Sequence, residues 1–210
     1  MTATAPGSDV DPGAVVDHFE SRAGRYQQDS VRWGWRWLRD RESRAVLTGL
    51  GDVAGRDVLE LGCGSGFFAR LLVAGGAARV VAVDLSEAMV ASLPGPPVEG
   101  VVGDAATIAL GRTFTHLLSA GLLEFVPDPA EVLVNARRHA DPGARLVILY
   151  PRHNLAGRGY RRYHRRHGFA IHLFRPAAIE AMAGAAGWRC LDSHPVAPFS
   201  CVATFEAYSP

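Results

Sequence analysis

The 210-residue chain contains no lysine, so every side chain with a permanent positive charge is an arginine. The 22 basic residues stand against 21 acidic ones. The formal net charge of +1 provides no general attraction to nucleic acid, and we expect no nucleic-acid partner.

Cysteine is scarce as well. Cys63, Cys190 and Cys201 have neither the spacing of a metal site nor the even number of a disulfide framework. We therefore predict reduced thiols in a reducing, cytoplasmic compartment, and no metal centre.

Long apolar runs are also missing: none approaches the ~20 residues that span a bilayer. Residues 1–10 lack the basic and apolar parts of a signal peptide. We expect no integral membrane segment, a disordered tail over residues 1–12 and a helical N-terminal segment over 13–50. With 48% hydrophobic residues, the rest of the chain (51–210) is able to form one core domain.

Apolar runs with strand character alternate with helical patterns after residue 50. The predicted strands cover 57–61, 79–84, 98–102, 114–119, 145–150, 188–196 and 201–207, and the predicted helices cover 67–73, 86–93, 127–140 and 176–186. This order predicts an α/β fold: a seven-stranded, mostly parallel sheet with helices on both faces and an antiparallel edge strand. Within the N-terminal segment, Trp33 and Trp37 share a helical face, which we expect to be buried.

A glycine-rich loop, Gly62-Cys63-Gly64-Ser65-Gly66, follows the first predicted strand. Glycines let the backbone approach a ligand closely, and the helix that follows directs free N–H groups at it. Read from Gly64, the run also fits the dinucleotide pattern G-x-G-x-x-A. The loop alone therefore leaves a nicotinamide-dependent oxidoreductase open.

Glu60 lies two residues before the first glycine. A carboxylate at this position would repel a pyrophosphate by roughly a few kcal/mol. It suits a ligand that carries an ammonium and a sulfonium group, and S-adenosylmethionine is such a ligand.

The run from Glu60 to Gly66 resembles the first motif of class I, Rossmann-like S-adenosylmethionine-dependent methyltransferases. Asp84 with the following Leu-Ser-Glu-Ala-Met is similar to their second motif, Gly103-Asp104-Ala105 to their third, and residues 142–148 to the turn and strand near the end of their sheet. The resemblance covers about residues 55–207 and implies S-adenosylmethionine as the cofactor.

The resemblance also implies roles. Asp84 is expected to bind the two ribose hydroxyls, Leu85 and Met89 the adenine ring, and Asp104 its exocyclic amine. The expected cofactor-binding residues are Glu60, Gly62, Cys63, Gly64, Asp84, Leu85, Met89, Asp104, Ala105 and Ser119. Ser119 or Ala120 would offer a carbonyl to the ammonium group. A helix cap for Asp84 and a turn for Asp104 are the structural alternatives.

Three residues are candidates for catalysis. Glu124 follows the fourth predicted strand, where many relatives carry a histidine-containing run, and could act as a general base or simply as an acid at a helix N-terminus. His18 and Tyr26 belong to a run that resembles the lid of small-molecule methyltransferases, where each could reach the site or serve only in packing.

Residues 151–179 contain no acid but seven arginines and four histidines. If residues 159–167 form a helix, its tyrosines and histidines share one face and arginines cover the other. Three interpretations stay open: a solvated basic face, recognition of an anionic acceptor, and contact with an anionic membrane or a carrier protein. For the second, we predict a basic insertion over about 151–175 with Arg152, Tyr160, Arg161 and Arg162 as substrate-binding residues.

We therefore expect a methyltransferase that acts on a small molecule, with O-methylation favoured. The N-terminal segment resembles that of porphyrin and quinone-pathway O-methyltransferases. A protein that uses the bound sulfonium for a rearrangement without methyl transfer is the alternative. A homodimer is left open.

Overall fold

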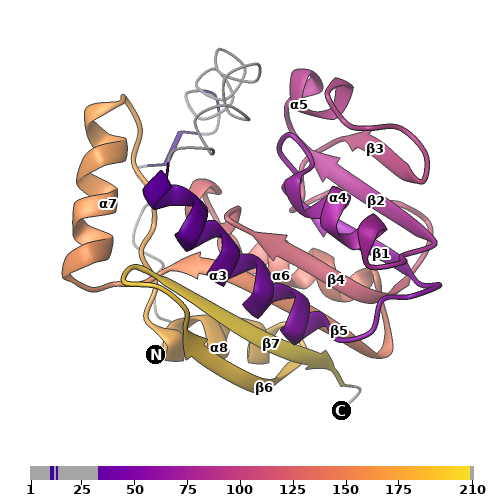
Figure 1. Cartoon of the computed structure of the whole chain (residues 1–210). Coiled ribbons are helices and arrows are strands. Elements are labelled where there is room, and N and C mark those ends of the chain that lie inside the picture. Colours follow the sequence, from indigo (N-terminus) through magenta and orange to yellow (C-terminus); the bar gives the residue numbers. More distant parts are fainter. Residues whose placement is uncertain (1–9, 12, 14–32, 209–210) are drawn as a thin grey trace.

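The computed structural model describes residues 10, 11, 13 and 33–208 (Figure 1). Seven strands form one sheet: β1 (Asp57–Leu61), β2 (Arg79–Asp84), β3 (Val98–Val102), β4 (Phe114–Ala120), β5 (Ala140–Pro151), β6 (Trp188–Pro195) and β7 (Ser200–Ala207). The helices are α3 (Trp33–Leu50), α4 (Phe67–Ala74), α5 (Glu87–Ala91), α6 (Pro129–Arg138), α7 (Leu155–Arg166) and α8 (Pro176–Ala185), with a 3₁₀ turn, η1, at Leu123–Phe125.

The strand order is β3-β2-β1-β4-β5-β7-β6. Strands β1 to β5 are parallel to one another, whereas β7 is antiparallel to both β5 and β6. The predicted α/β fold with a mostly parallel seven-stranded sheet is confirmed. The reversed strand is β7, one position in from the edge, because the tight 195–200 turn sends β7 back between β5 and β6.

The strand order reverses between β1 and β4, whose connections leave in opposite directions. In such sheets a crevice opens at the carboxyl ends of the strands at this point, and ligands bind there. The central strands β1 and β2 are buried almost throughout, since helices cover both faces. Helices α3 and α4 pack on one face, and α6 and α8 on the other (Figure 1).

Trp37 corrects the expectation for the N-terminal segment. Its side chain is 56% exposed, and the Arg41 guanidinium lies 5.0 Å from the centre of its ring. Helix α3 packs on the sheet through Leu38, Val46 and Leu50, and Trp37 lies on the opposite side of the helix. The prediction that Trp37 belongs to the core is therefore wrong.

Two elements differ in length from the predicted ones. Strand β5 begins at Ala140, because the Asp-Pro-Gly run that was expected to separate it from the preceding helix forms a bulge inside the strand. Helix α7 begins at Leu155, since the side chain of Asn154 accepts a hydrogen bond from the Gly157 amide and caps it. Within residues 33–208, no helix combines the length and apolar character needed to cross a bilayer.

Candidate active site

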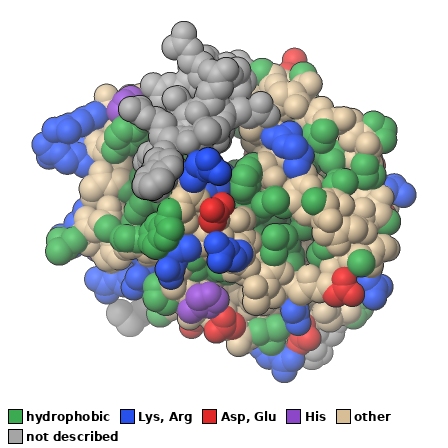
Figure 2. Space-filling view, in the orientation of Figure 1, with side chains coloured by type: hydrophobic (Ala, Val, Ile, Leu, Met, Phe, Trp, Pro, Cys, Tyr) green, Lys and Arg blue, Asp and Glu red, His purple; other side chains and the backbone are tan. Residues whose placement is uncertain are grey.

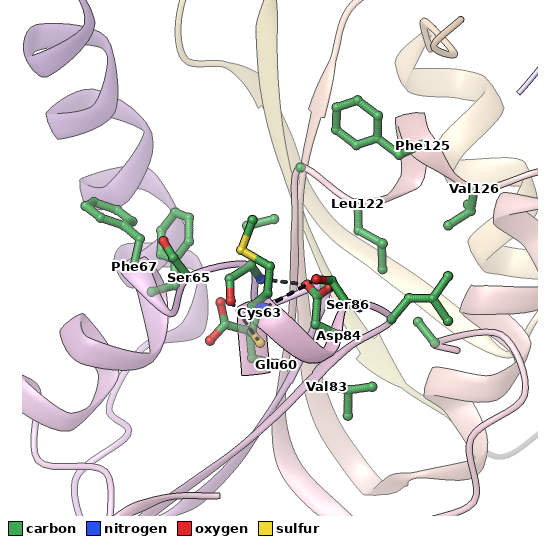
Figure 3. A pocket seen from close by; sticks show the side chains of 18 of the residues that line it. Glu60, Cys63, Ser65, Phe67, Val83, Asp84, Ser86, Leu122, Phe125 and Val126 are labelled. Carbon is green, nitrogen blue, oxygen red and sulfur yellow. Dashed lines mark hydrogen bonds between the residues drawn. The ribbon is translucent and has the colours of Figure 1, made fainter. Parts of the chain in front are cut away.

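A cavity of about 240 Å³ lies at the carboxyl ends of β1, β2 and β4 (Figure 3). Its lining comprises Arg39, Glu60, Gly62, Cys63, Gly64, Ser65, Phe67, Phe68, Val83, Asp84, Leu85, Ser86, Met89, Gly103, Asp104, Ala105, Ala120, Gly121, Leu122, Phe125, Val126 and Pro127. The cavity therefore occupies the point where the strand order reverses.

The glycine loop supplies one wall. Gly62 and Gly64 have φ angles of +75° and +50°, a region that side chains disfavour. A Cβ at Gly62 would lie 2.8 Å from the Cβ of Leu122, whereas one at Gly64 would meet nothing within 4 Å. A side chain at position 62 would therefore collide with Leu122, whereas the backbone of Gly64 is open to the close approach of a ligand.

Asp84 lies at the end of β2 and is tied to the loop. Its Oδ2 accepts a hydrogen bond of 2.7 Å from the Gly64 amide, and its Oδ1 accepts one of 3.0 Å from the Ser86 amide. Each carboxylate oxygen keeps a second acceptor position. Helix α5 is capped by Ser86, whose hydroxyl accepts from the Met89 amide. Asp84 is therefore not the side-chain cap of α5 and can bind a pair of hydroxyl groups.

Glu60 is buried at the end of β1, and its Oε2 has no hydrogen-bond partner within residues 33–208. Burial, with the nearby Asp84 as the second cause, raises the pKa of Glu60 to about 8. A cationic ligand bound here would provide the positively charged partner that the Glu60 carboxylate lacks. Burial and the same two acids raise the pKa of the Cys63 thiol, so that Cys63 remains protonated.

The loop that follows β3 completes this side of the cavity. Asp104 is exposed, and its Oδ1 accepts a hydrogen bond of 2.9 Å from the Ala106 amide. The loop is held from α6, because the Asn135 amide group donates to the carbonyls of Ala105 and Ile108. Leu85 is 47% exposed and adjoins the cavity, where it offers an apolar surface. Ser119 is buried and does not line the cavity, whereas the next residue, Ala120, does.

The opposite wall is apolar and comes mainly from the segment after β4. Leu122, Phe125 and Val126 face the glycine loop across the cavity (Figure 3). Arg39 of α3 is the one cation that lines the cavity within the described part of the chain, and its guanidinium lies 4.5 Å from the centre of the Phe67 ring. Nothing in the sequence near Arg39 indicates this position, because it depends on how α3 crosses the sheet.

Glu124 lies behind this wall. It is 4% exposed, its Oε2 has no hydrogen-bond partner within residues 33–208, and its Oε1 is 3.7 Å from where a Cβ at Gly121 would be. Burial, followed by the charge of Glu42 on α3, raises the pKa of Glu124 to about 8. Burial also raises the pKa of Glu42, which the Ser200 hydroxyl and Arg39 oppose. Glu42 was not predicted from the sequence.

The remaining predicted residues lie elsewhere. Arg152, Tyr160, Arg161 and Arg162 do not line the cavity. Tyr160 stacks on Phe199, and the two following arginines point to solvent. His18 and Tyr26 lie outside the described residues.

Comparison with known proteins agrees with this geometry. Residues 59–148 match the family model described as a methyltransferase domain. The chain is 28% identical over 137 residues to the tRNA U34 carboxymethyltransferase of Methylococcus capsulatus, over 60% of this chain and 42% of that protein. It is also 28% identical over 161 residues to the ubiquinone biosynthesis O-methyltransferase of Bordetella bronchiseptica, over 67% of this chain and 61% of that protein.

Solved structures share the fold over nearly the whole chain. Magnesium protoporphyrin IX methyltransferase (ChlM) from Synechocystis PCC 6803 with bound SAH superposes with a TM-score of 0.75, at 18% identity, over 94% of this chain and 100% of that one. The DhpI–SAH complex has a TM-score of 0.72 at 26% identity, over 97% and 100%. Residues 59–148 carry the methyltransferase domain, and the chain has the class I, Rossmann-like fold of S-adenosylmethionine-dependent methyltransferases.

The cofactor of this methyltransferase is S-adenosylmethionine. The cavity fits it: the unpartnered Oε2 of Glu60 suits a cationic methionine end, the open backbone of Gly64 admits close approach, and Asp84 keeps acceptor positions for two hydroxyls. A pyrophosphate would instead lie against Glu60, as the sequence indicated.

The methyltransferase spans about 42% of the length of the tRNA carboxymethyltransferase that it matches. Within residues 33–208, no group of three or more His, Cys, Asp or Glu side chains is arranged to hold a metal ion.

Proposed function

We propose that this methyltransferase transfers the methyl group of S-adenosylmethionine to an oxygen atom of a small-molecule acceptor. One observation carries the proposal: a single cavity joins the charged cofactor wall to the apolar wall of Leu122, Phe125 and Val126, behind which Glu124 is buried. A small, largely apolar acceptor fits such a wall.

The cofactor supplies a methyl group on a positively charged sulfur, which leaves as a neutral thioether. Much of the catalysis then comes from holding the acceptor oxygen in line. The apolar wall positions the acceptor and excludes water. In its ionised form, which is the minor form at neutral pH and the major form above its pKa of about 8, Glu124 accepts the proton of the acceptor hydroxyl as the methyl group is transferred.

The relatives support a small acceptor in part. One is an O-methyltransferase of ubiquinone biosynthesis and one of the solved structures is a magnesium protoporphyrin IX methyltransferase. The tRNA-modifying relative shares less of its length with this chain, and the +1 net charge favours an acceptor that is not nucleic acid.

An anionic acceptor held by Arg152, Arg161, Arg162 or Tyr160 stays a prediction. If Arg161 and Arg162 hold it, R161Q/R162Q raises KM for the acceptor and leaves cofactor affinity unchanged. An unchanged KM would exclude this role.

The function is tested by incubating the purified chain with S-adenosylmethionine carrying an isotopically labelled methyl group and a panel of phenols, alcohols and carboxylic acids. The proposal expects a product that has gained one labelled methyl group on oxygen, and S-adenosylhomocysteine in equal amount. Methyl groups on nitrogen or carbon would contradict O-methylation. An acceptor that is converted without formation of S-adenosylhomocysteine would show the alternative, a rearrangement without methyl transfer.

A further inference from the structure

Helix α7 carries five arginines on one face. Arg158, Arg161, Arg162, Arg165 and Arg166 follow the spacing i, i+3, i+4, i+7 and i+8. At 100° per residue they fall within an arc of about 140° and extend over about 12 Å of the helix. All five are exposed. We call this set the arginine face.

The other side of α7 holds the helix against the body of the molecule. His164 is buried, and its ring lies 5.7 Å from that of Phe125, which lines the cavity. Tyr160 stacks on Phe199 at 4.9 Å. Close to the helix start, a Cβ at Gly157 would overlap the Arg152 carbonyl, so that α7 begins in direct contact with the end of β5. The arginine face is therefore presented on a fixed support, one residue layer away from the cavity.

The charges of the arginine face are not neutralised within the described part of the chain. None of its five guanidinium groups has a carboxylate within 4 Å there, although Arg79, Arg112 and Arg189 all form ion pairs elsewhere in the same part. No acid occurs between Pro151 and Ile179. Figure 2 shows arginine side chains at the left edge of the molecule, where Figure 1 places α7.

The arginine face also includes an apolar side chain. Leu155, seven residues before Arg162, lies on the same side of the helix and is 84% exposed. Tyr163 flanks the face and is 51% exposed. Arginine and tyrosine are the residues that protein interfaces favour, and an exposed leucine among charges gives such an interface its apolar contact.

The distribution of charge along the chain indicates which kind of partner the arginine face can bind. Without the seven arginines of residues 152–175, 15 arginines stand against 21 acidic residues, and the rest of the chain carries a formal charge of −6. The formal charge of −6 on the rest of the chain gives an extended polyanion such as RNA no net attraction beyond the arginine face. A membrane would require a broad apolar stripe, but the aromatic residues Tyr160 and His164 point inward. A compact acidic surface fits the face alone.

We propose that the arginine face of α7 is the docking surface for an acidic helix or patch of a partner protein, seated beside the cavity. The partner supplies carboxylates to the arginines and an apolar pocket to Leu155. The proposal concerns binding of a partner and stands whichever acceptor the cavity takes.

The test measures binding of a fluorescent helical peptide in which glutamates recur at i, i+3, i+4, i+7 and i+8 around one methionine. The full chain is titrated into the peptide at low ionic strength, and anisotropy is recorded. R158Q/R162Q/R165Q is expected to weaken binding at least about tenfold. The control R44Q/R56Q/R138Q removes three exposed arginines elsewhere, with the same change in net charge, and is expected to bind within about twofold of the wild type.

L155A distinguishes a protein interface from a purely electrostatic one. It is expected to weaken peptide binding about three- to tenfold, because it removes apolar contact without changing charge. Affinity for S-adenosylmethionine, measured on every variant, is expected to be unchanged. A loss of that affinity would report damage to the fold or to the cofactor site, and not to the docking surface.

Three results would overturn the proposal. The first is an equal loss of binding in both triple variants. The second is no binding of the peptide at low ionic strength. The third is tighter binding of unfractionated tRNA, or of vesicles containing phosphatidylglycerol, than of the peptide, with L155A behaving as the wild type in that assay.

Discussion

The two sides of the cavity each contain a buried carboxyl group, and the neighbours of the two groups differ. Glu60 and Glu124 both have a pKa raised to about 8, chiefly by burial. A nearby acid also raises each pKa, Asp84 for Glu60 and Glu42 for Glu124, although a backbone hydrogen bond opposes the shift of Glu124. Asp84 lines the cavity and accepts a hydrogen bond from the Gly64 amide of the glycine loop, whereas Glu42 comes from α3, far away in the chain.

The comparison shows that a raised pKa does not by itself define a role. Glu60 faces a place for a cation, so that ligand binding would remove its proton. Glu124 lies behind an apolar wall with a second acid, so that at neutral pH most of it is protonated and only its ionised fraction can act as a base. The cofactor side is built from adjacent strand ends, and the acceptor side from segments that only the fold brings together.

The largest expected effect is a change in the free energy of unfolding, and it comes from Glu124 on the acceptor side of the cavity. In the unfolded chain Glu124 ionises near 4.5, whereas in the folded chain it stays protonated to about pH 8. The unfolded chain therefore binds fewer protons between these values, and stability falls as pH rises through this window. We expect E124Q to exceed the wild type by roughly 2–4 kcal/mol in free energy of unfolding at pH 8, and by less than about 1 kcal/mol at pH 5. Urea denaturation at both pH values measures this difference in free energy of unfolding. A stabilisation by E124Q that does not depend on pH would contradict burial as the cause of the raised pKa.

The next largest effect is on cofactor binding. D84A removes the carboxylate that would bind the ribose hydroxyls, and we expect the affinity for S-adenosylmethionine to fall at least about tenfold in calorimetry. The control is D57A, which removes an acid at the opposite end of the sheet, where Asp57 pairs with Arg79. Unchanged affinity in D84A would contradict the assignment of this side.

A third measurement compares the two carboxyls directly. If the cofactor requires ionised Glu60, its affinity for the wild type rises up to about tenfold from pH 7 to pH 9, since most Glu60 is protonated at pH 7. E60Q loses this contribution, and E124Q keeps it. The α-amino group of the cofactor titrates in the same range, so that the difference between wild type and E60Q is the informative quantity. Equal pH dependence in the two would exclude a charged Glu60 in the complex.

The smallest expected effect separates a ligand contact from backbone strain. Gly64 and Gly55 have φ angles of +50° and +69°, and a Cβ would meet nothing within 4 Å at either. G64A and G55A should each cost about 1 kcal/mol in free energy of unfolding. Only G64A should also weaken cofactor binding, by roughly three- to tenfold, because only Gly64 lines the cavity. Equal cofactor affinity in both variants would show that the ligand does not approach Gly64.

The residues of the cofactor side could be predicted because the neighbouring sequence marks each of them. Glu60 and Asp84 lie at the ends of buried strands and Asp104 follows the edge strand β3, and parallel strands bring such ends together. The acceptor side was predictable only at Glu124, from its place after β4. Arg39 and Glu42 occur in a charged stretch that resembles a solvated helix face. Only the packing of α3 across β5 and β7 places Arg39 at the cavity and Glu42 near Glu124.

The errors in the predicted elements have the same origin. Trp37 was assigned to the core from its size and spacing, but the inward side of α3 is set by Leu38, Val46 and Leu50. The helix considered over residues 159–167 begins four residues later than α7. In the structure Gly157 permits contact with the Arg152 carbonyl, and Asn154 caps the helix. Tertiary contacts outweigh helix propensity at such positions.

The close approach of Leu122 to Gly62 has a consequence for redesign of this enzyme. Leu122 fills the space directly above the glycine loop and lies at the boundary between the two walls of the cavity. Under the proposed function, shortening this side chain would enlarge the apolar wall that takes the acceptor, while Glu60, Asp84 and Gly64 stay unchanged. Leu122 is therefore the position from which to broaden the range of acceptors without rebuilding the cofactor site.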